Sequence, residues 1–345
     1  MSDRVTLREV ALEAGVHIST ASRALNNETA SIVSPETGRR VLEAARKLGY
    51  SPNPLAKGLR TNRTMSVGVV IPDIENPLFG PIIAGIEGTL AEEGYSTLIT
   101  DAGRSDPDLV SSVVETLIER RVDGMILAMA TRTGATVESV HRRNIPVVLV
   151  NRSSEGVPVP SIVGDDHAGI SLAVEHLAGL GHVRIGHIAG PKSLSTGMGR
   201  FQAFVSKMED LGLESGPEVV AHADWYQVEP GYKAARELLD RRPDLTAIVA
   251  ANDLIALGAY RAIREHGLEV GPDVSVIGYN DIPLLDLLQP ALTSVRIPYR
   301  KMGSEAAAML LGMMFSDDNE TMRTVSVKLM PTLSIRASTQ PPRAV

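Results

Sequence analysis

The chain has 345 residues, of which 43% are hydrophobic and 22% are charged, and its formal net charge is −7. It contains no cysteine, which excludes disulfides and cysteine-ligated metals. No apolar run has the length of a signal peptide or a membrane span, so we expect a cytoplasmic protein. The length is more than double the ~150 residues typical of one domain and predicts two or three compact units.

Charge is distributed unevenly along the chain. Residues 1–64 hold ten basic and six acidic side chains, whereas the remainder holds 24 basic and 35 acidic ones. The net negative charge alone argues against nucleic-acid binding. A basic segment on an acidic body is nevertheless expected when only one end of a protein meets phosphates. The first segment is therefore the candidate nucleic-acid interface.

This first segment predicts two short helices separated by a tight turn. Thr6 and Glu9 have the spacing of a capping box that begins a helix over 7–14. Gly15 ends this helix, and a second helix follows over 18–25. Two short helices joined by such a turn are typical of the helix-turn-helix motif of DNA-binding proteins.

The second of these helices carries the residues predicted to read DNA. Ile18, Ser19 and Arg23 face outward and can reach a thymine methyl, a base edge and a guanine in the major groove. Phosphate contacts that fix the register are expected from Thr20, Ser22, Asn26 and Arg8. The competing interpretation is a small helical bundle that binds nothing, which the local positive charge disfavours.

A third helix and a linker complete the first segment. Ser34 supplies an N-cap and Pro35 the first turn of the helix, and Gly49 ends it. The predicted core face of this helix comprises Val41, Leu42, Ala45 and Leu48. Residues 51–63 contain prolines, a glycine and basic side chains, which predicts a linker with at most one short helix.

After Met65 short apolar runs alternate with longer amphipathic stretches. The apolar runs lie at 67–71, 96–100, 124–128, 147–150, 184–189, 247–251 and 274–278. Strands that are apolar on both faces and alternate with helices are typical of parallel sheets covered by helices on both sides. Because there are too many such units for one compact sheet, we expect two α/β subdomains.

Short patterns in the first sixty residues are shared with one known family. They are Thr6-Leu7, Val10-Ala11, Ala14-Gly15-Val16, Thr20-Ala21-Ser22-Arg23, Tyr50-Ser51-Pro52-Asn53 and Ala56-Lys57-Gly58-Leu59. With these patterns the chain resembles the lactose-repressor (LacI) family of bacterial transcription regulators. The resemblance implies DNA contacts for Thr6 and Ala56, and insertion of Leu59 from each subunit as a wedge into the minor groove.

Two residues depart from the family pattern. His17 stands where the family usually has Ser or Thr at the start of the recognition helix, and it is a poorer N-cap. Gly58 lies inside the presumed hinge helix and weakens it by up to ~1 kcal/mol relative to alanine. Both departures suggest a DNA-binding head that becomes ordered mainly on DNA.

The resemblance extends over nearly the whole chain and implies a fold for the remainder. It predicts an all-α helix-turn-helix headpiece (1–50), a hinge (51–63) and a periplasmic-binding-protein-like body (64–345) for effector binding and dimerisation. The body would have two α/β lobes joined by three crossover strands. The predicted bounds of lobe 1 are 64–161 plus 293–325, and those of lobe 2 are 162–292 plus 326–345.

Ligands of open parallel sheets bind beyond the carboxyl ends of the strands, so residues just after the apolar runs are the candidates. Together with family positions that face ligand, this rule predicts an effector site of Phe79, Arg152, Thr196, Arg200, Trp225, Asn252 and Asn280. Other interpretations stay open: Trp225 as a core residue, the two arginines as surface charges, Asp253 as a helix cap and Asp281 as a structural residue.

The predicted site residues also indicate a chemical class for the effector. An aromatic face with arginine and amide groups suits a polyhydroxylated ring, so a sugar or sugar derivative is expected. The Gly-Tyr-Asp-Asp of sugar-binding members is Gly278-Tyr279-Asn280-Asp281 here. One carboxylate is thus replaced while Arg152 and Arg200 remain, which makes an acidic sugar or another anionic metabolite the alternative.

No catalytic, cofactor or metal motif is found. The sequence lacks a phosphate-binding loop, a nucleophile elbow and an HExxH pattern, so we predict no catalysis, no cofactor and no metal. We expect an effector-controlled repressor that binds operator DNA as a homodimer or tetramer. The rivals are a solute-binding protein of a transporter, a sensor of another metabolite class and a Rossmann-type enzyme. Whether the effector is an inducer or a corepressor stays open.

Overall fold

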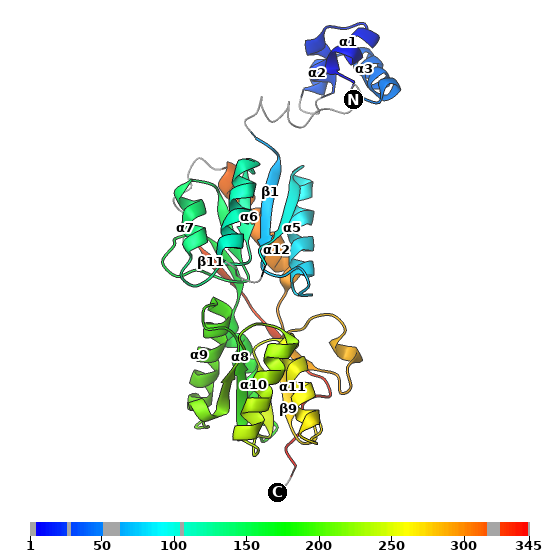
Figure 1. Ribbon diagram of the computed structural model, residues 1–345. Helices are drawn as coiled ribbons and strands as arrows, with labels where there is room; N and C mark the ends of the chain where they lie inside the picture. Colours follow the sequence, from blue (N-terminus) through cyan, green and yellow to red (C-terminus); the bar gives the residue numbers. More distant parts are fainter. Residues whose placement is uncertain (1–4, 26–28, 51–62, 104–106, 316–324, 344–345) are drawn as a thin grey trace. The chain divides into compact units, whose positions relative to one another are not determined.

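The computed structural model describes residues 5–25, 29–50, 63–103, 107–315 and 325–343. The chain forms two compact units, residues 1–64 and 65–345, which we describe separately and call the head and the body (Figure 1). This division falls within one residue of the predicted boundary between hinge and body.

The head is a small helical unit, as predicted. Its elements are α1 (Leu7–Glu13), α2 (Ile18–Ala24), the 3-10 helix η1 (Ala30–Ile32) and α3 (Pro35–Leu48). The capping box forms, since the Glu9 N–H donates to Thr6 Oγ1 and the Thr6 N–H donates to Glu9 Oε2 at 2.7 Å. The α3 cap is also as predicted, with Ser34 Oγ accepting from the Thr37 N–H.

The core of the head consists of small apolar side chains, namely Val10, Ala11, Ala14, Ala21, Ala24, Val41, Ala44 and Ala45. Leu42 was predicted on the core face of α3, but its side chain is 45% exposed. Ala44 takes the place that we predicted for Leu42. A core of this size leaves the polar side chains of the short helices at the surface.

Two six-stranded sheets form the centres of the two lobes of the body. The sheet of lobe 1 has the order β11-β5-β4-β3-β1-β2, and all its strands are parallel. Its strands are β1 (Ser66–Ile71), β2 (Ser96–Asp101), β3 (Gly124–Leu127), β4 (Val147–Val150), β5 (Ser161–Gly164) and β11 (Ser326–Leu329). The edge strand β2 is only partly buried, with Ile99 44% exposed, which differs from the predicted burial of both faces.

The sheet of lobe 2 has the order β12-β10-β9-β8-β6-β7. Its strands are β6 (Ile185–Ala189), β7 (Val220–His222), β8 (Ala247–Ala250), β9 (Ser275–Asn280), β10 (Thr293–Arg296) and β12 (Thr332–Ser334). The edge strand β12 is antiparallel to β10, whereas the other pairs are parallel. Two 3-10 helices accompany this lobe, η2 (Pro217–Val219) and η3 (Leu285–Leu287).

Helices cover both faces of the sheets, as the apolar runs predicted. They are α5 (Phe79–Glu92), α6 (Pro107–Glu119), α7 (Ala135–Arg142), α8 (Asp166–Gly179), α9 (Ser195–Asp210), α10 (Val228–Arg241), α11 (Asp253–Glu265) and α12 (Tyr299–Phe315). In β1, Val69 packs in the main core while its neighbour Val70 packs with Val110 and Val114 of α6 on the opposite face. Such alternation buries both faces of a strand.

The chain crosses between the lobes three times, and each crossing follows the end of a strand. Strand β5 pairs in the first sheet before α8 begins, β10 pairs in the second sheet before α12, and β11 pairs in the first sheet before β12. The predicted lobe boundaries were therefore wrong for 162–164, 293–296 and 326–329. The chain completes each strand in one sheet before it leaves, so the crossings fall a few residues later than predicted.

Within the described ranges, no helix combines the length and the hydropathy needed to cross a membrane.

Candidate functional site

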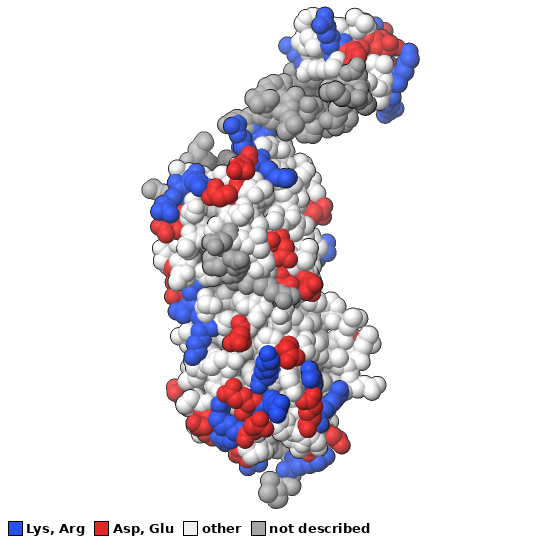
Figure 2. All heavy atoms as spheres, in the orientation of Figure 1, with Lys and Arg blue, Asp and Glu red and all other residues white. Residues whose placement is uncertain are grey.

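The head presents a helix-turn-helix with polar side chains on its second helix. Gly15 has a φ of 62°, the left-handed conformation that a glycine adopts without strain, and it turns the chain from α1 into α2. Ile18, Ser19 and Arg23 are exposed, as predicted. Thr20 and Ser22 are half-buried and Thr6 is exposed. Lys and Arg side chains lie at the surface of the head, with Asp and Glu side chains among them (Figure 2).

His17 acts as the N-cap of α2, which we expected to be poorly capped. Its Nδ1 accepts from the Ser19 N–H at 3.3 Å and lies 2.8 Å from Ser19 Oγ. The imidazole therefore satisfies a backbone N–H at the start of the helix and also holds the hydroxyl of a residue predicted to read bases. Asn26, Ala56, Gly58 and Leu59, which the sequence also singled out, lie outside the described residues.

The body contains a small polar cavity at the carboxyl ends of its strands. It is lined by Asn76, Leu78, Phe79, Asn151, Arg152, Thr196, Arg200, Tyr226, Asn252 and Asn280. Every residue predicted for the effector site is among them except Trp225. The cavity volume is about 20 Å³, whereas one water molecule requires about 10–15 Å³. The lobes are therefore packed together at this point, with no room for a sugar.

Strand ends bring the lining residues together. Asn151 and Arg152 follow β4, Asn252 follows β8, and Asn280 ends β9. Asn151 and Asn280 have φ values of 66° and 114°, so their backbones leave the strands in the left-handed region. Residues held in this way cluster at ligand sites, because the surrounding structure must enforce the strained conformation.

Direct contacts join the two lobes beside the cavity. The Ser153 N–H donates to Ser195 Oγ at 3.0 Å, and the Arg132 N–H donates to the Ser193 carbonyl at 3.0 Å. The Gln227 side chain donates to Asp73 Oδ2 at 3.4 Å. These few hydrogen bonds would have to break if the lobes separated to admit a ligand.

Arg200 is a buried cation with its partners already in place. Its side chain is 4% exposed, so the alternative of a surface charge was wrong. Nε donates to Asp166 Oδ1 at 2.8 Å, Nη1 donates to the Ala251 carbonyl at 2.6 Å, and the guanidinium lies 3.7 Å from the centre of the Tyr279 ring. Burial alone would lower the pKa of Arg200, but the attraction of Asp166 and Tyr279 keeps it above its ordinary value.

Arg152 is equally buried, at 4% exposure, but its surroundings differ. Among the described residues, its Nε and Nη1 atoms have no hydrogen-bond partner. The guanidinium lies 5.7 Å from the centre of the Trp225 ring, within reach of a cation–π contact. Burial lowers the pKa of Arg152 to about 10, Tyr226 acts against this change, and the charge of Arg200 adds to it.

Trp225 does not line the cavity, and its half-buried side chain packs against the core of the body. The next residue, Tyr226, does line it and donates its hydroxyl to Thr196 Oγ1 at 3.0 Å. Our sequence analysis missed Tyr226. Its position next to the only tryptophan, in a segment without regular structure, was the available signal.

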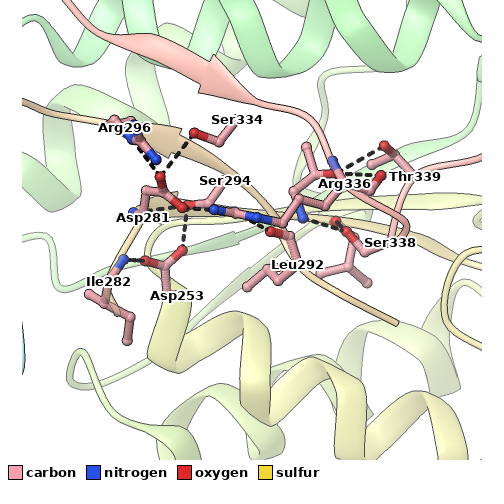
Figure 3. Close-up of polar contacts among 12 residues, drawn as sticks. Asp253, Asp281, Ile282, Leu292, Ser294, Arg296, Ser334, Arg336, Ser338 and Thr339 are labelled. Atoms are coloured by element: carbon pink, nitrogen blue, oxygen red, sulfur yellow. Dashed lines mark hydrogen bonds and ion pairs between the residues drawn. The ribbon is translucent and has the colours of Figure 1, made fainter. Parts of the chain in front are cut away.

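Asp253 and Asp281 do not line the cavity but belong to a separate polar network, which Figure 3 shows. Asn252 and not Asp253 caps α11, since its Oδ1 accepts from the Ile255 N–H, so the predicted cap was one residue off. Asp253 is fully buried and accepts from the Ile282 N–H at 2.9 Å and from Ser294 Oγ at 2.5 Å. Burial raises the pKa of Asp253 to about 7.

Asp281 is held by two arginines. Its carboxylate lies 2.6 Å from Arg296 Nε and 2.7 Å from Arg336 Nη1, and it accepts from Ser334 Oγ at 2.9 Å (Figure 3). Burial would raise the pKa of Asp281, but these donors hold it below its ordinary value. The structural interpretation of Asp281 therefore applies, and the network fixes the ends of β9 and β10 next to Asn280.

Within the part of the chain that the structure describes, no group of three His, Asp or Glu side chains could hold a metal ion.

The chain thus combines a helix-turn-helix unit with a two-lobed α/β unit that holds a polar cavity between its lobes. This combination defines the class of regulatory proteins that carry a ligand-binding body. Residues 6–53 match the family "Bacterial regulatory proteins, lacI family", and residues 174–339 match a "Periplasmic binding protein-like domain".

Known proteins are similar to this chain over nearly its whole length. The HTH-type transcriptional repressor CytR of Escherichia coli (strain K12) is 35% identical over 310 residues, which cover 90% of this chain and 89% of that protein. The Lac repressor dimer bound to operator and the anti-inducer ONPF has a TM-score of 0.87 at 29% identity and covers 98% of this chain and 100% of that chain. The complex of the transcriptional regulator CelR with cellobiose has a TM-score of 0.74 at 32% identity, covering 97% and 100%.

The chain therefore belongs to the lacI family of bacterial regulatory proteins. The predicted fold, an all-α headpiece and a two-lobed α/β body, is confirmed by these matches. The similar proteins named here are transcription regulators rather than enzymes.

Proposed function

We propose that this protein is a transcription repressor that binds operator DNA through its head and responds to a small molecule held between the lobes of its body. The observation that carries this proposal is the helix-turn-helix, in which α2 presents Ile18, Ser19 and Arg23 to solvent. The Lac repressor dimer, a structural neighbour, is bound to operator, which supports the same partner and a homodimer here. A protein with this partner acts where the chromosome lies, which favours the cytoplasm.

Roles in the head divide into base reading and positioning. A guanine contact by Arg23 and a thymine-methyl contact by Ile18 would read sequence in the major groove. Thr6, Thr20 and Ser22 would bind phosphates and set the register. Roles for Asn26, Ala56 and Leu59 rest on the sequence alone, since the three residues lie outside the described residues.

The body would act as the sensor. A cavity with four asparagine amides and two hydroxyl-bearing side chains suits a polyhydroxylated ligand, and CelR in its complex holds cellobiose. Because the cavity volume is about 20 Å³, a sugar can bind only when the lobes move apart. Ligand binding would therefore shift the equilibrium between lobe arrangements, which is the physical basis of effector control.

The rival function, a solute-binding protein of a transporter, would use the same body. It gives no role to a helix-turn-helix with exposed Arg23 and Ser19 on α2. We expect no catalysis, because the two carboxylates with a raised pKa have partners within the chain and do not line the cavity. Asp253 accepts from the Ile282 N–H and from Ser294, and Asp166 accepts from Arg200.

A DNA-binding assay on the upstream region of the protein's own gene tests the proposal. We expect the intact chain to bind with an affinity that falls about 10³- to 10⁵-fold between 50 and 200 mM salt if it makes 6–10 phosphate contacts. Deletion of residues 1–60 should abolish binding while the body stays folded. Absence of binding at low salt by the intact chain, to this region and to genomic fragments, would contradict the proposal.

A further inference from the structure

Arg152 is the one feature of the cavity wall that the fold leaves electrostatically incomplete among the described residues. Arg152 is only 4% exposed, and it lines the cavity. Its Nε and Nη1 atoms have no hydrogen-bond partner among the described residues. Burying an ionised group without a partner is costly, and native structures usually pair such groups or use them for function. These two N–H donors are therefore available to a bound group in the cavity.

Arg200 provides the internal comparison. It lines the same cavity and is buried to the same extent, but Asp166 neutralises it and the Ala251 carbonyl accepts from it. The groups that act on Arg152 are the hydroxyl of Tyr226 and the cation of Arg200, and neither supplies negative charge at neutral pH. Among the described residues of the cavity wall, the positive charge of Arg152 thus has no negative partner, whereas that of Arg200 has one.

We propose that the effector carries an anionic group, a carboxylate or a phosphate, which pairs with Arg152. This inference rests on the proposed effector-binding role of the cavity. The planar guanidinium presents its N–H donors in a fork that matches two oxygens of such a group. The hydroxyls of a sugar could accept these hydrogen bonds, but they would leave the charge unbalanced in a water-poor site.

The other residues of the cavity wall indicate the chemistry of the rest of the ligand, to which the anionic group is attached. Asn76, Asn151, Asn252 and Asn280 offer neutral donors and acceptors, and Phe79 offers an apolar face. Amides of this kind suit hydroxyl groups, and the aromatic face suits the C–H face of a ring. The expected ligand class is therefore a sugar phosphate or a sugar acid, with the anionic group at the Arg152 end.

The test uses the full-length protein with neutral sugars and with derivatives of the same sugars that carry an anionic group. The panel pairs glucose, ribose and cellobiose with glucose 6-phosphate, ribose 5-phosphate, glucuronate and cellobionate, and adds inorganic phosphate. Calorimetry and the midpoint of thermal unfolding report binding, and glucuronate against glucose 6-phosphate separates a carboxylate from a phosphate. We expect an anionic member to bind at least tenfold more tightly than its neutral partner.

Variants then assign that preference to the arginine. Arg152→Met should weaken the anionic probe about 10- to 100-fold, which is the loss expected for hydrogen bonds to a charged group. Arg152→Lys should retain part of the affinity, and Arg143→Met, which removes an exposed arginine from the same lobe, should retain all of it. Without ligand, Arg152→Met should unfold at a temperature no lower than the wild type, because an unpaired buried charge is removed.

Several results would overturn the inference: a neutral sugar that binds more tightly than every anionic member, no anionic member that binds, or an Arg152→Met protein that loses both probes equally. An unliganded Arg152→Met protein that unfolds several degrees lower would show a structural arginine and would also overturn it. DNA binding is measured on the same preparations. A protein that binds operator DNA but does not prefer anionic ligands would contradict this inference alone. A protein that does not bind DNA would contradict the proposed function.

Discussion

The head and the body place the side chains proposed for recognition in opposite environments. In the head, Ser19 and Arg23 are exposed on a short helix above a core of valines and alanines. In the body, Arg152 and Arg200 are 4% exposed and line the cavity, Arg152 just after β4 and Arg200 within α9. An exposed side chain affects binding and contributes little to stability, whereas a buried charge affects both, because its desolvation must be compensated in the folded state.

The comparison leads to a general expectation for variants. Substitutions at DNA-facing positions that cap no helix, such as Arg23, should change affinity and leave the free energy of unfolding unchanged. Substitutions in the cavity wall should change the free energy of unfolding, and the sign should depend on whether the residue has its partner within the chain. The predictions below begin with the cavity, where the effects are largest.

The largest effect is expected from breaking the buried ion pair of the body. Asp166→Ala leaves Arg200 buried without its counter-charge, which should lower the free energy of unfolding by about 3–5 kcal/mol. Denaturant unfolding of the body, followed by circular dichroism, measures this loss. The exposed pair Arg143–Glu115 supplies the control, since Glu115→Ala should leave the denaturation midpoint unchanged.

The same pair has a second check. Replacing both partners, with Asp166→Leu and Arg200→Met, should recover much of the stability that Asp166→Ala loses, because no unpaired charge remains. A double variant as unstable as Asp166→Ala would mean that packing on Tyr279, and not charge, carries the effect. In that case, the contrast between Arg152 and Arg200 would lose its electrostatic basis.

Asp253 should give the next largest effect, and it depends on pH. Its pKa is raised to about 7 in the folded state, against about 3.9 in an unfolded chain. The folded state therefore binds this proton more tightly, and the stability that it contributes is complete below pH 4 and is lost as the pH rises through 7. Asp253→Asn mimics the neutral acid. Over that pH range, its free energy of unfolding relative to the wild type should increase by up to about 1.4 kcal/mol per pH unit.

The measurement is the difference in the free energy of unfolding between Asp253→Asn and the wild type at several pH values from 5 to 8. Titrating groups that do not act on Asp253 contribute equally to both proteins and cancel in the difference, whereas Asp281, whose charge acts on Asp253, cancels only in part. A difference that does not change with pH would show that Asp253 is ionised in the fold. Its contacts with Ser294 and Ile282 would then stabilise a buried carboxylate.

A structural feature could be predicted from the sequence where it depends on residues close together in the chain. The cap residues Thr6, Ser34 and Gly49 were predicted correctly because capping depends on neighbours within a few residues. Strand β11 was assigned to the wrong lobe because it pairs with β5, more than 160 residues earlier, and its own pattern does not specify that partner. Long-range pairing of a short edge strand leaves no periodic signal.

The cavity shows the same limit. Residues just after strands were placed correctly, since the carboxyl ends of parallel strands meet at one edge of a sheet. The sequence could not show that Asp166 neutralises Arg200 while Arg152 stays unpaired, because the partner lies 34 residues away on another element. It also could not show that Trp225 packs against the core while Tyr226 lines the cavity, because irregular segments have no fixed side-chain period.

In the head, we expect Arg23→Ala to weaken DNA binding to an intermediate degree and to leave the stability of the head unchanged. Loss of a bidentate guanine contact should weaken specific DNA binding by about 1–3 kcal/mol, which is about 5- to 150-fold, and should relax specificity at one base position. Fluorescence anisotropy with the selected operator and its single-base variants measures both. Arg39→Ala, which removes an exposed arginine from α3, should weaken binding to all sequences equally or not at all.

Uniform weakening by Arg23→Ala across all operator variants would assign Arg23 to a phosphate instead of a base. A loss of head stability in this variant would contradict the comparison itself. It would mean that an exposed residue of α2 also supports the fold.

The smallest effect tests an exposed head residue that supports the fold and also contacts a residue predicted to read bases. His17 caps α2 through the Ser19 N–H and contacts the Ser19 hydroxyl, so both stability and DNA reading depend on it. His17→Ala should therefore destabilise the head by about 0.5–2 kcal/mol, whereas His17→Ser, which restores a preferred cap, should match or exceed the wild type. Hydrogen exchange of the α2 amides in the full-length protein measures the local effect. If Ala and Ser at this position protect α2 equally, the cap does not limit the stability of α2, and the core of the head rather than His17 determines it.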